Sequence, residues 1–393
     1  MRAPRTILVG LPFAMALAAC GGKPDPAAAS DAAVASADAS AGRAGCRHPG
    51  VGGGKVVGVL SRNLYLGADL TPVIQAQDFQ QFLAATTAVW ATVNDNDFRA
   101  RAVGIADEIA GERPALIGLQ EAYLWRIQDP GDFLSGGTTP ATTVVYDYAS
   151  ELLAALADRG LHYEVAAEVA LFDFEAPIAT GQDVRLTDRG VILARSGLKI
   201  ANPFGQVFST LLPLPVLGQT LPVQRGWVSV EVKHRGEELR FVSTHLESFH
   251  PVVRVAQAAE LRAALEGEQR PVVLVGDLNS EPGTEGEAVL AEAGFVDAWA
   301  AVHPGSAGYT CCWPEDLGVP SPPAPPLDQR IDYVLARGPL LPLEAEVLGD
   351  EEGDRVAVEG TARQLWPSDH GGVLARLRIL APSSPSRGPS RSP

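Results

Sequence analysis

Short apolar runs, each followed by a polar or turn-forming segment, recur along the chain from residue 55 to residue 380. The clearest is 272–275 in PVVLVGDLNSEP, a continuous run of Val and Leu of the kind that fills a strand buried on both faces. Two segments, 225–233 and 238–243, alternate around a turn and predict an antiparallel pair. Further strands are predicted at 55–61, 115–119, 162–171, 183–195, 330–335 and 373–379.

Between these strands, apolar residues recur at helical spacing. This spacing predicts amphipathic helices over 79–90, 98–109, 148–159, 255–265 and 286–293. Because the sequence has no internal linker and no detectable repeat, the pattern indicates one α/β domain over residues 55–380.

The segment 202–224 is apolar but interrupted by prolines, which favours a hairpin or an exposed loop over a helix. If it is exposed, its apolar side chains form a patch suited to lipid or to a partner protein. The alternative is that the segment packs on the sheet. The side chains concerned are Phe204, Phe208, Leu211, Leu212, Leu214 and Val216.

Residues 1–20 have the order of features of a bacterial export signal. Arg2 and Arg5 precede an apolar run too short to span a bilayer, and small residues then lead to Cys20. The LAAC that ends at Cys20 resembles the lipobox of bacterial lipoproteins, in which the cysteine is acylated and becomes the new N-terminus. The next residue is Gly21 rather than Asp, and this resembles the pattern of lipoproteins that are sent to the outer membrane. The expected location is therefore outside the cytoplasm, lipid-anchored to the cell envelope at the outer membrane.

The segments on either side of the predicted domain lack the large apolar side chains that a core requires. Residues 21–54 consist mainly of Ala, Asp, Ser and Gly, and they predict a disordered tether. Residues 381–393 are rich in Pro and Ser, and they predict a disordered tail.

The chain is strongly acidic, with a formal net charge of −16. Cleavage before Cys20 would remove Arg2 and Arg5 and no acidic residue, which leaves −18. A surface of this charge repels phosphate polymers in general. A phosphate ligand would therefore need a local positive charge to offset this repulsion, such as a bound divalent cation.

Four cysteines occur, and acylation of Cys20 would leave Cys46, Cys311 and Cys312. An exported protein can oxidise its thiols, but three thiols leave the pairing open. The adjacent pair is accompanied by no CxxC or HExxH pattern, so the sequence predicts no zinc site.

Polar residues able to bind ions or move protons stand at the ends of the apolar runs. A single pair such as Asp277 and Asn279 can be explained by an Asx turn, in which the side chains bond to their own backbone. Repetition of the arrangement at one strand end after another favours a common site. The residues are Asn63, Glu121, His245, Asp277, Asn279, Asp332, Asp369 and His370.

These residue types suit hydrolysis of a phosphate ester. Carboxylate and amide oxygens are ligands for Mg²⁺, Mn²⁺ or Ca²⁺. Histidines beside acidic residues can transfer protons or stabilise developing negative charge. A cation that offsets the phosphate charge, together with an oriented water, is what in-line attack on phosphorus requires.

The order of the motifs resembles the endonuclease/exonuclease/phosphatase superfamily, which includes deoxyribonuclease I, apurinic endonucleases, bacterial neutral sphingomyelinases and inositol polyphosphate 5-phosphatases. The motifs that carry the resemblance are SRNLY, LQEA, DRGVI, STHLE, GDLNS, RIDYV and SDHGG, and they span about residues 55–380. The fold that the resemblance implies is a four-layer α/β sandwich, with two packed mixed β-sheets flanked by helices. The cysteines in YTCCWPED belong to none of these motifs.

The resemblance also implies roles for individual positions. Glu121 and Asn63 look like the site of a bound Mg²⁺, with Asp369 as a further contact and Mn²⁺ or Ca²⁺ as alternatives. Asp277 would orient or deprotonate the attacking water, and Asp332 would orient a catalytic imidazole. The remaining implied positions are Asn279, which would hold the phosphate and Asp277; His370, the catalytic imidazole; His245, which would contact the scissile phosphate or leaving group; and Arg189, a phosphate contact.

The resulting hypothesis is an extracytoplasmic, lipid-anchored, Mg²⁺-dependent phosphoesterase that acts as a monomer on a nucleic acid, a phospholipid or an inositol phosphate. The acidic composition favours a small or lipid-borne substrate over duplex DNA, because the sequence shows no cluster of basic residues suited to bind the backbone of a duplex. The competing hypothesis is a binding or interaction lipoprotein of the same fold whose site is not catalytic. Mg²⁺ binding and turnover distinguish the two.

Overall fold

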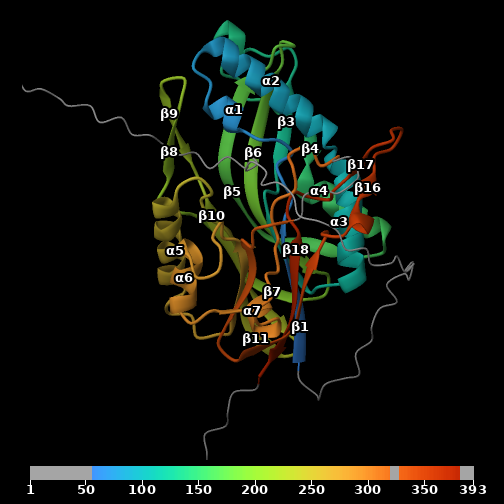
Figure 1. Cartoon of the computed structure of the whole chain (residues 1–393), viewed down its shortest axis with the longest axis vertical. Helices are drawn as coiled ribbons and strands as arrows, with labels where there is room; N and C mark the ends of the chain where they lie inside the picture. Colours follow the sequence, from blue (N-terminus) through green and yellow to red (C-terminus); the bar gives the residue numbers. More distant parts are fainter. Residues whose placement is uncertain (1–54, 319–326, 381–393) are drawn as a thin grey trace, which may run out of the picture. The chain divides into compact units, whose positions relative to one another are not determined.

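The computed structural model describes residues 55–318 and 327–380. Within them, two β-sheets pack face to face, and helices cover the outer face of each sheet (Figure 1). The four-layer α/β sandwich predicted from the sequence is therefore confirmed. The predicted export signal at 1–20, tether at 21–54 and tail at 381–393 lie outside the described residues.

The first sheet has eight strands in the order β15-β18-β1-β2-β6-β3-β4, and β5 also pairs with β6. It is a mixed sheet, because β1 is parallel to β2 and antiparallel to β18. Its strands are β1 (Lys55–Asn63), β2 (Leu116–Gln120), β3 (Leu124–Gln128), β4 (Thr143–Asp147), β5 (Tyr163–Pro177), β6 (Asp183–Arg195), β15 (Leu340–Leu348) and β18 (Gly372–Ile379).

The second sheet has six strands in the order β13-β14-β12-β11-β10-β7. It is also mixed, because β11 is parallel to β12 and the other pairs are antiparallel. Its strands are β7 (Lys199–Val207), β10 (Gly226–His234), β11 (Glu237–His245), β12 (Val272–Asp277), β13 (Val296–Asp297) and β14 (Asp332–Arg337). Two short pairs stand apart, β8 (Leu212–Val216) with β9 (Gln219–Val223) and β16 (Val356–Ala357) with β17 (Gln364–Leu365).

The two sheets meet through a core of branched apolar side chains. Ile192 of the first sheet and Phe241 and Val275 of the second are fully buried in it. Gly118 on β2 makes the closest approach, because a Cβ there would lie 2.4 Å from Val275 Cγ2 and 2.7 Å from Ser243 Oγ. A glycine at this position therefore lets β2 of the first sheet lie directly against β11 and β12 of the second.

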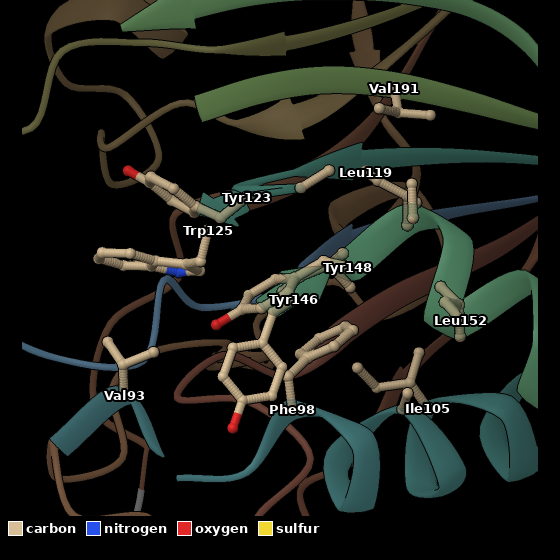
Figure 2. Packing of buried hydrophobic residues seen from close by; sticks show 14 of the residues in the cluster. Val93, Phe98, Ile105, Leu119, Tyr123, Trp125, Tyr146, Tyr148, Leu152 and Val191 are labelled. Carbon is tan, nitrogen blue, oxygen red and sulfur yellow. The ribbon is translucent and has the colours of Figure 1, made fainter. Parts of the chain in front are cut away.

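Helices bury the outer faces of both sheets. The first sheet is covered by α1 (Thr71–Ile74), α2 (Phe79–Asp95), α3 (Phe98–Glu112) and α4 (Tyr148–Asp158), and the second by α5 (Pro251–Leu265) and α6 (Glu285–Glu292). Figure 2 shows the first of these interfaces, where Phe98 and Tyr148 stack with ring centroids 3.6 Å apart. The remaining helices are α7 (Ala298–Val302) and the 3₁₀ turns η1 (Phe133–Ser135) and η2 (Glu352–Asp354). Within the described residues, no helix has the length and apolarity needed to cross a membrane.

Local sequence explains where the long helices over the first sheet begin. Asp78, Asp97 and Asp147 each precede a helix, and each side chain accepts a hydrogen bond from a backbone N–H of the first turn. Such caps satisfy donors that have no partner within the helix, which stabilises the helix by about 1 kcal/mol.

The structure differs from the sequence-based expectation at the sheet edges and in the 202–224 segment. Strands β3, β4, β7, β13 and β15 were not predicted from the sequence. The expected hairpin is present as β8 and β9, but the exposed apolar patch is not: Phe208, Leu212 and Val216 are buried, and Phe204 is the exposed member of the set. The alternative, in which the segment packs on the domain, describes it better.

An acid-sensitive contact joins the turn before β12 to β11. The Glu268 carboxylate accepts hydrogen bonds from the Arg270 backbone N–H and from both guanidinium groups, of Arg270 and Arg240. These bonds, led by those from Arg270, lower the pKa of Glu268 from 4.5 to about 2. Because the folded-state pKa is depressed, the contact stabilises the fold above pH 4.5 and is lost as the pH falls towards 2.

We expect Glu268→Gln to lower the free energy of unfolding by about 1–2 kcal/mol at pH 7 and by clearly less at pH 3. Urea unfolding at the two pH values measures the difference. The matched control is Glu238→Gln, because Glu238 is exposed and pairs with an exposed Lys233. An equal loss at both pH values would show that the charge of Glu268 is irrelevant.

Candidate active site

The strand ends of both sheets bring the predicted polar residues together. In the second sheet, His245, Asp277 and Asp332 are cross-strand neighbours at the ends of β11, β12 and β14. In the first sheet, Asn63 ends β1 and Glu121 directly follows β2. Asn63 Nδ2 donates to Asp277 Oδ2 at 3.1 Å, so the two sheets converge on one site.

Two of these residues have a backbone conformation that is rare outside glycine. Glu121 has φ +55° and Asn279 has φ +48°, in the left-handed region. That conformation costs a residue with a Cβ roughly 1–2 kcal/mol. The surrounding bonds hold it in place: Asn279 Nδ2 donates to Leu246 O at 3.0 Å, and Glu121 Oε2 accepts from the Leu66 N–H at 2.7 Å. Strained backbone of this kind gathers at functional sites.

Asp277 lies at the centre of the cluster. Its Oδ1 accepts from the Asn279 backbone N–H at 2.8 Å. Its Oδ2 lies 3.5 Å from His245 Nε2 and 3.9 Å from His370 Nε2, in addition to the bond from Asn63. Burial, followed by the charge of Asp332, raises the pKa of Asp277 from 3.8 to about 7. A carboxyl with such a pKa is suited to accept a proton near neutral pH.

His370 is held by Asp332. Its Nδ1 lies 2.8 Å from Asp332 Oδ2, and its Nε2 faces Asp277 and Asp369. Burial alone would lower the pKa of His370, but Asp332 and Asp369 outweigh this effect and raise the pKa well above 6.5. The imidazole is therefore cationic at neutral pH, with its Nε2–H directed into the site.

His245 has the opposite character, and Arg225 is the cause. An Arg225 guanidinium N–H donates to His245 Nδ1 at 2.9 Å, so Nδ1 is the acceptor and Nε2 carries the proton. Burial and then the charge of Arg225 lower the pKa of His245 well below 6.5. His245 is therefore a neutral imidazole that presents an Nε2–H towards Asp277.

Arg225 was not predicted from the sequence. It is nearly buried just before β10, and its guanidinium also lies 3.4 Å from Asp188 Oδ2. Burial raises the pKa of Asp188 to about 7, against the opposing effect of Arg225. The sequence does show a charged residue between the apolar 202–224 segment and a buried strand. Its role could not be predicted, because its partners come from distant parts of the chain.

The predicted metal donors lie beside Asp277. Asn63 Nδ2 also donates to Glu121 Oε1 at 3.3 Å, and Glu121 remains partly exposed. Burial raises the pKa of Asp369 to about 6, and the charge of Glu121 adds to this effect. The charge of Glu121 thus acts on both Asp277 and Asp369, and burial favours the neutral form of these two aspartates. A divalent cation fits this donor set, because it would offset the concentrated negative charge.

A second group of donor atoms overlaps the first. Oxygen or nitrogen atoms of Asp277, Asp332 and His370 all lie within 4.8 Å of one another. In this group His370 Nδ1 already bonds to Asp332, whereas Asp332 Oδ1 is buried without a hydrogen-bond partner. The bonded pair has the arrangement of an oriented imidazole, which favours Glu121 and Asn63 as the cation donors.

Arg189 lies on β6 near the cluster, but its guanidinium is engaged elsewhere. Its Nε donates to Ala122 O at 2.9 Å, and another guanidinium N–H donates to the Asp147 carboxylate. Contact with a phosphate would have to compete with this ion pair. Its role as a phosphate contact stays a prediction, and Arg225 is the arginine that bonds to a site histidine.

Comparison with known proteins assigns the chain to a family. The family model described as "Endonuclease/Exonuclease/phosphatase family" matches residues 80–370. The chain belongs to this family. Members of the endonuclease/exonuclease/phosphatase family are phosphoesterases and nucleases and generally depend on divalent metal ions. The match includes every candidate site residue except Asn63.

A solved structure of this family has a similar fold. An endonuclease/exonuclease/phosphatase family protein from Bacteroides thetaiotaomicron is 18% identical, with a TM-score of 0.50, over 84% of this chain and 100% of that chain. A family protein from Beutenbergia cavernae is 21% identical, with a TM-score of 0.48, over 83% of this chain and 72% of that chain. A mannosyl-6-phosphatase from Bacteroides thetaiotaomicron is 18% identical, with a TM-score of 0.49, over 82% of this chain and 99% of that chain. No curated protein matches the chain in sequence.

Proposed function

We propose that this protein is a divalent-cation-dependent phosphoesterase that hydrolyses phosphodiester or phosphomonoester bonds. The observation that carries the proposal is the position of Asp277 Oδ2, which faces the Nε2 atoms of His245 and His370 and accepts a bond from Asn63. A general base, a cationic imidazole and a neutral donor imidazole thereby surround one point. Together these groups can accept the proton of water and stabilise negative charge at one phosphate ester.

Each residue has a role that follows from its charge and its bonds. Asp277, with its pKa raised to about 7, accepts the proton of the attacking water at Oδ2. His370, kept cationic by Asp332, stabilises negative charge that develops on the phosphoryl oxygens. His245 donates its Nε2–H to a phosphate oxygen or to the leaving group. Asn279 positions Asp277 through its backbone N–H.

Glu121 and Asn63 would hold the cation, with Asp369 as a further contact, and Mg²⁺ is the proposed ion. When bound, such a cation offsets phosphate charge and polarises the P–O bond. The donors are hard oxygen ligands, which suit Mg²⁺ and also Mn²⁺ or Ca²⁺.

The proposed substrate is a small or lipid-borne phosphate ester rather than duplex DNA. The acidic chain, at −16 before any processing, repels a polyanion outside the immediate reach of a cation. A nuclease remains the second candidate, supported by the nucleases within the family. A non-catalytic binding protein of the same fold is the competing class, and it is disfavoured by the hydrogen bonds of Asn63 to Asp277 and of His370 to Asp332.

We also propose that the protein is exported, acylated at Cys20 and held at the outer membrane as a monomer. The support for export and acylation is the order of charge, apolar run, small residues and cysteine in residues 1–20, and Gly21 after the cysteine supports the outer membrane. Metabolic labelling with a fatty-acid analogue tests it. Label in the wild type that is lost in Cys20→Ala supports acylation, and equal labelling of both contradicts it.

Parallel assays on one preparation test the substrate class. The substrates are duplex DNA, sphingomyelin vesicles and inositol phosphates, each with Mg²⁺ and with EDTA. We expect EDTA-sensitive hydrolysis of a lipid or inositol phosphate that exceeds hydrolysis of DNA. Preferred cleavage of DNA would make the nuclease the correct assignment, and no hydrolysis of any of them would favour the non-catalytic binding protein.

Replacing Glu121 tests the position of the cation. We expect Glu121→Gln to raise the Mg²⁺ concentration for half-maximal turnover by at least about tenfold, because an amide is a weaker ligand than a carboxylate. Turnover at saturating Mg²⁺ should fall much less. Glu164→Gln is the control, since Glu164 is exposed on β5. An unchanged Mg²⁺ dependence in Glu121→Gln would place the cation elsewhere.

A further inference from the structure

Cys311 and Cys312 form a disulfide between adjacent residues, directly beside the catalytic imidazole. Cys311 is fully buried, and its Sγ lies 3.6 Å from His370 Nε2. The two sulfur atoms and a ring nitrogen of His370 all lie within 4.8 Å of one another. No step of the proposed hydrolysis uses either cysteine.

The backbone holds Cys311 in this position independently of the disulfide. Cys311 N donates to Gln329 O at 3.0 Å, and its carbonyl accepts from the N–H groups of Asp328 and Gln329. The adjacent Thr310 and Trp313 bond to the segment that carries His370, through Gly371 N to Thr310 O and Trp313 N to Asp369 O. Opening the disulfide would therefore leave the sulfur next to the imidazole.

We propose that, after reduction, Cys311, Cys312 and His370 form a binding site for a thiophilic divalent cation such as Zn²⁺, and that this cation withdraws His370 from hydrolysis. The reductant is a dithiol, which attacks the partly exposed Cys312 Sγ, breaks the S–S bond and is itself oxidised to a disulfide. Two protein thiols form. Binding of the cation then releases both thiol protons and the proton on His370 Nε2.

The donor chemistry separates this site from the proposed Mg²⁺ site. Two thiolates and an imidazole nitrogen form a soft set that selects Zn²⁺, whereas Glu121 and Asn63 offer hard oxygen atoms. In the oxidised protein the sulfur atoms are bonded to each other and cannot serve as thiolate ligands, so the disulfide keeps His370 available.

Cobalt spectroscopy on the full chain tests the binding site without relying on turnover. Oxidised and dithiol-reduced protein, freed of excess reductant, are each titrated with Co²⁺, and thiols are counted in both. The matched control is Cys311→Ser with Cys312→Ser, which keeps Cys20 and Cys46. We expect reduction to expose two more thiols in the wild type than in the control, and a thiolate-to-cobalt charge-transfer band in the reduced wild type alone. Cys312→Ser, which alters the partly exposed residue, repeats the test if the double variant is unstable, and it should lose the band.

Inhibition of turnover by Zn²⁺ is the second readout, and it rests on the proposed function. We expect equimolar Zn²⁺ to lower Mg²⁺-supported turnover of the reduced wild type by about tenfold or more, and to leave the oxidised wild type and the double variant unaffected. A charge-transfer band of equal strength in the double variant, a band in the oxidised protein, or no gain of thiols on reduction would each overturn the proposal. If no form hydrolyses any substrate, the cobalt spectrum still decides the binding site.

Discussion

His370→Ala is expected to lower turnover of an activated phosphodiester by about 10³-fold, the effect of losing a cationic group at the reacting centre. Asp332 Oδ2, 2.8 Å from His370 Nδ1, and Asp369 maintain this charge. The substitution removes both the positive charge and the Nε2–H that faces Asp277. Because His370 interacts with the transition state, the loss should appear in kcat more than in KM.

The assay is the initial rate of bis(4-nitrophenyl) phosphate hydrolysis at saturating Mg²⁺, with thermal unfolding measured on the same samples. His162→Ala is the control, because His162 is exposed. Equal turnover in His370→Ala and His162→Ala, with both variants folded, would remove His370 from the mechanism.

Asp277→Asn is expected to lower turnover by a similar factor, about 10³-fold, because an amide cannot accept the proton of water. The same substitution should not lower the free energy of unfolding above pH 7, although it lowers turnover. Burial and Asp332 raise the folded-state pKa of Asp277 to about 7, well above its ordinary value of 3.8. An acid whose pKa is raised on folding makes the fold less stable as the pH rises from its ordinary pKa, 3.8, towards the folded-state pKa, about 7, and the full loss is present above pH 7.

We therefore expect Asp277→Asn, at pH 8 in EDTA, to unfold with a free energy equal to or above that of the wild type. The amide Oδ1 can still accept from the Asn279 N–H. Urea unfolding measures this. Leu278→Ala is the comparison, because it removes a fully buried apolar side chain and should cost about 2–5 kcal/mol. A large loss of stability in Asp277→Asn would contradict the electrostatic description of the site.

The strand ends could be predicted because the apolar runs are short and uninterrupted. Val272–Val275 is wholly apolar, so the polar residues beyond it stand out. Which strands are neighbours cannot be read from such runs. The register that sets Asp277 beside both His245 and Asp332 depends on β12 lying between β11 and β14, and these strands are far apart in sequence.

Contacts between distant residues account for the rest of what the sequence left open. Arg225 bonds to His245 and Asp188, and neither residue is adjacent to it in sequence. The left-handed backbone at Glu121 is held by a bond to another segment, since Glu ordinarily avoids this conformation, whereas Asn, the residue at position 279, adopts it more readily. No role for the Cys311–Cys312 pair could be predicted from the sequence, because His370, which Cys311 contacts, lies 59 positions away along the chain.

The most direct test of the central claim is the rate of bis(4-nitrophenyl) phosphate hydrolysis by the wild-type chain, stripped with EDTA and then titrated with Mg²⁺. We predict no measurable rate before Mg²⁺ is added and a saturable rise as it is added. A rate that is independent of Mg²⁺, or one that never exceeds the rate of His370→Ala at any Mg²⁺ concentration, would contradict the account.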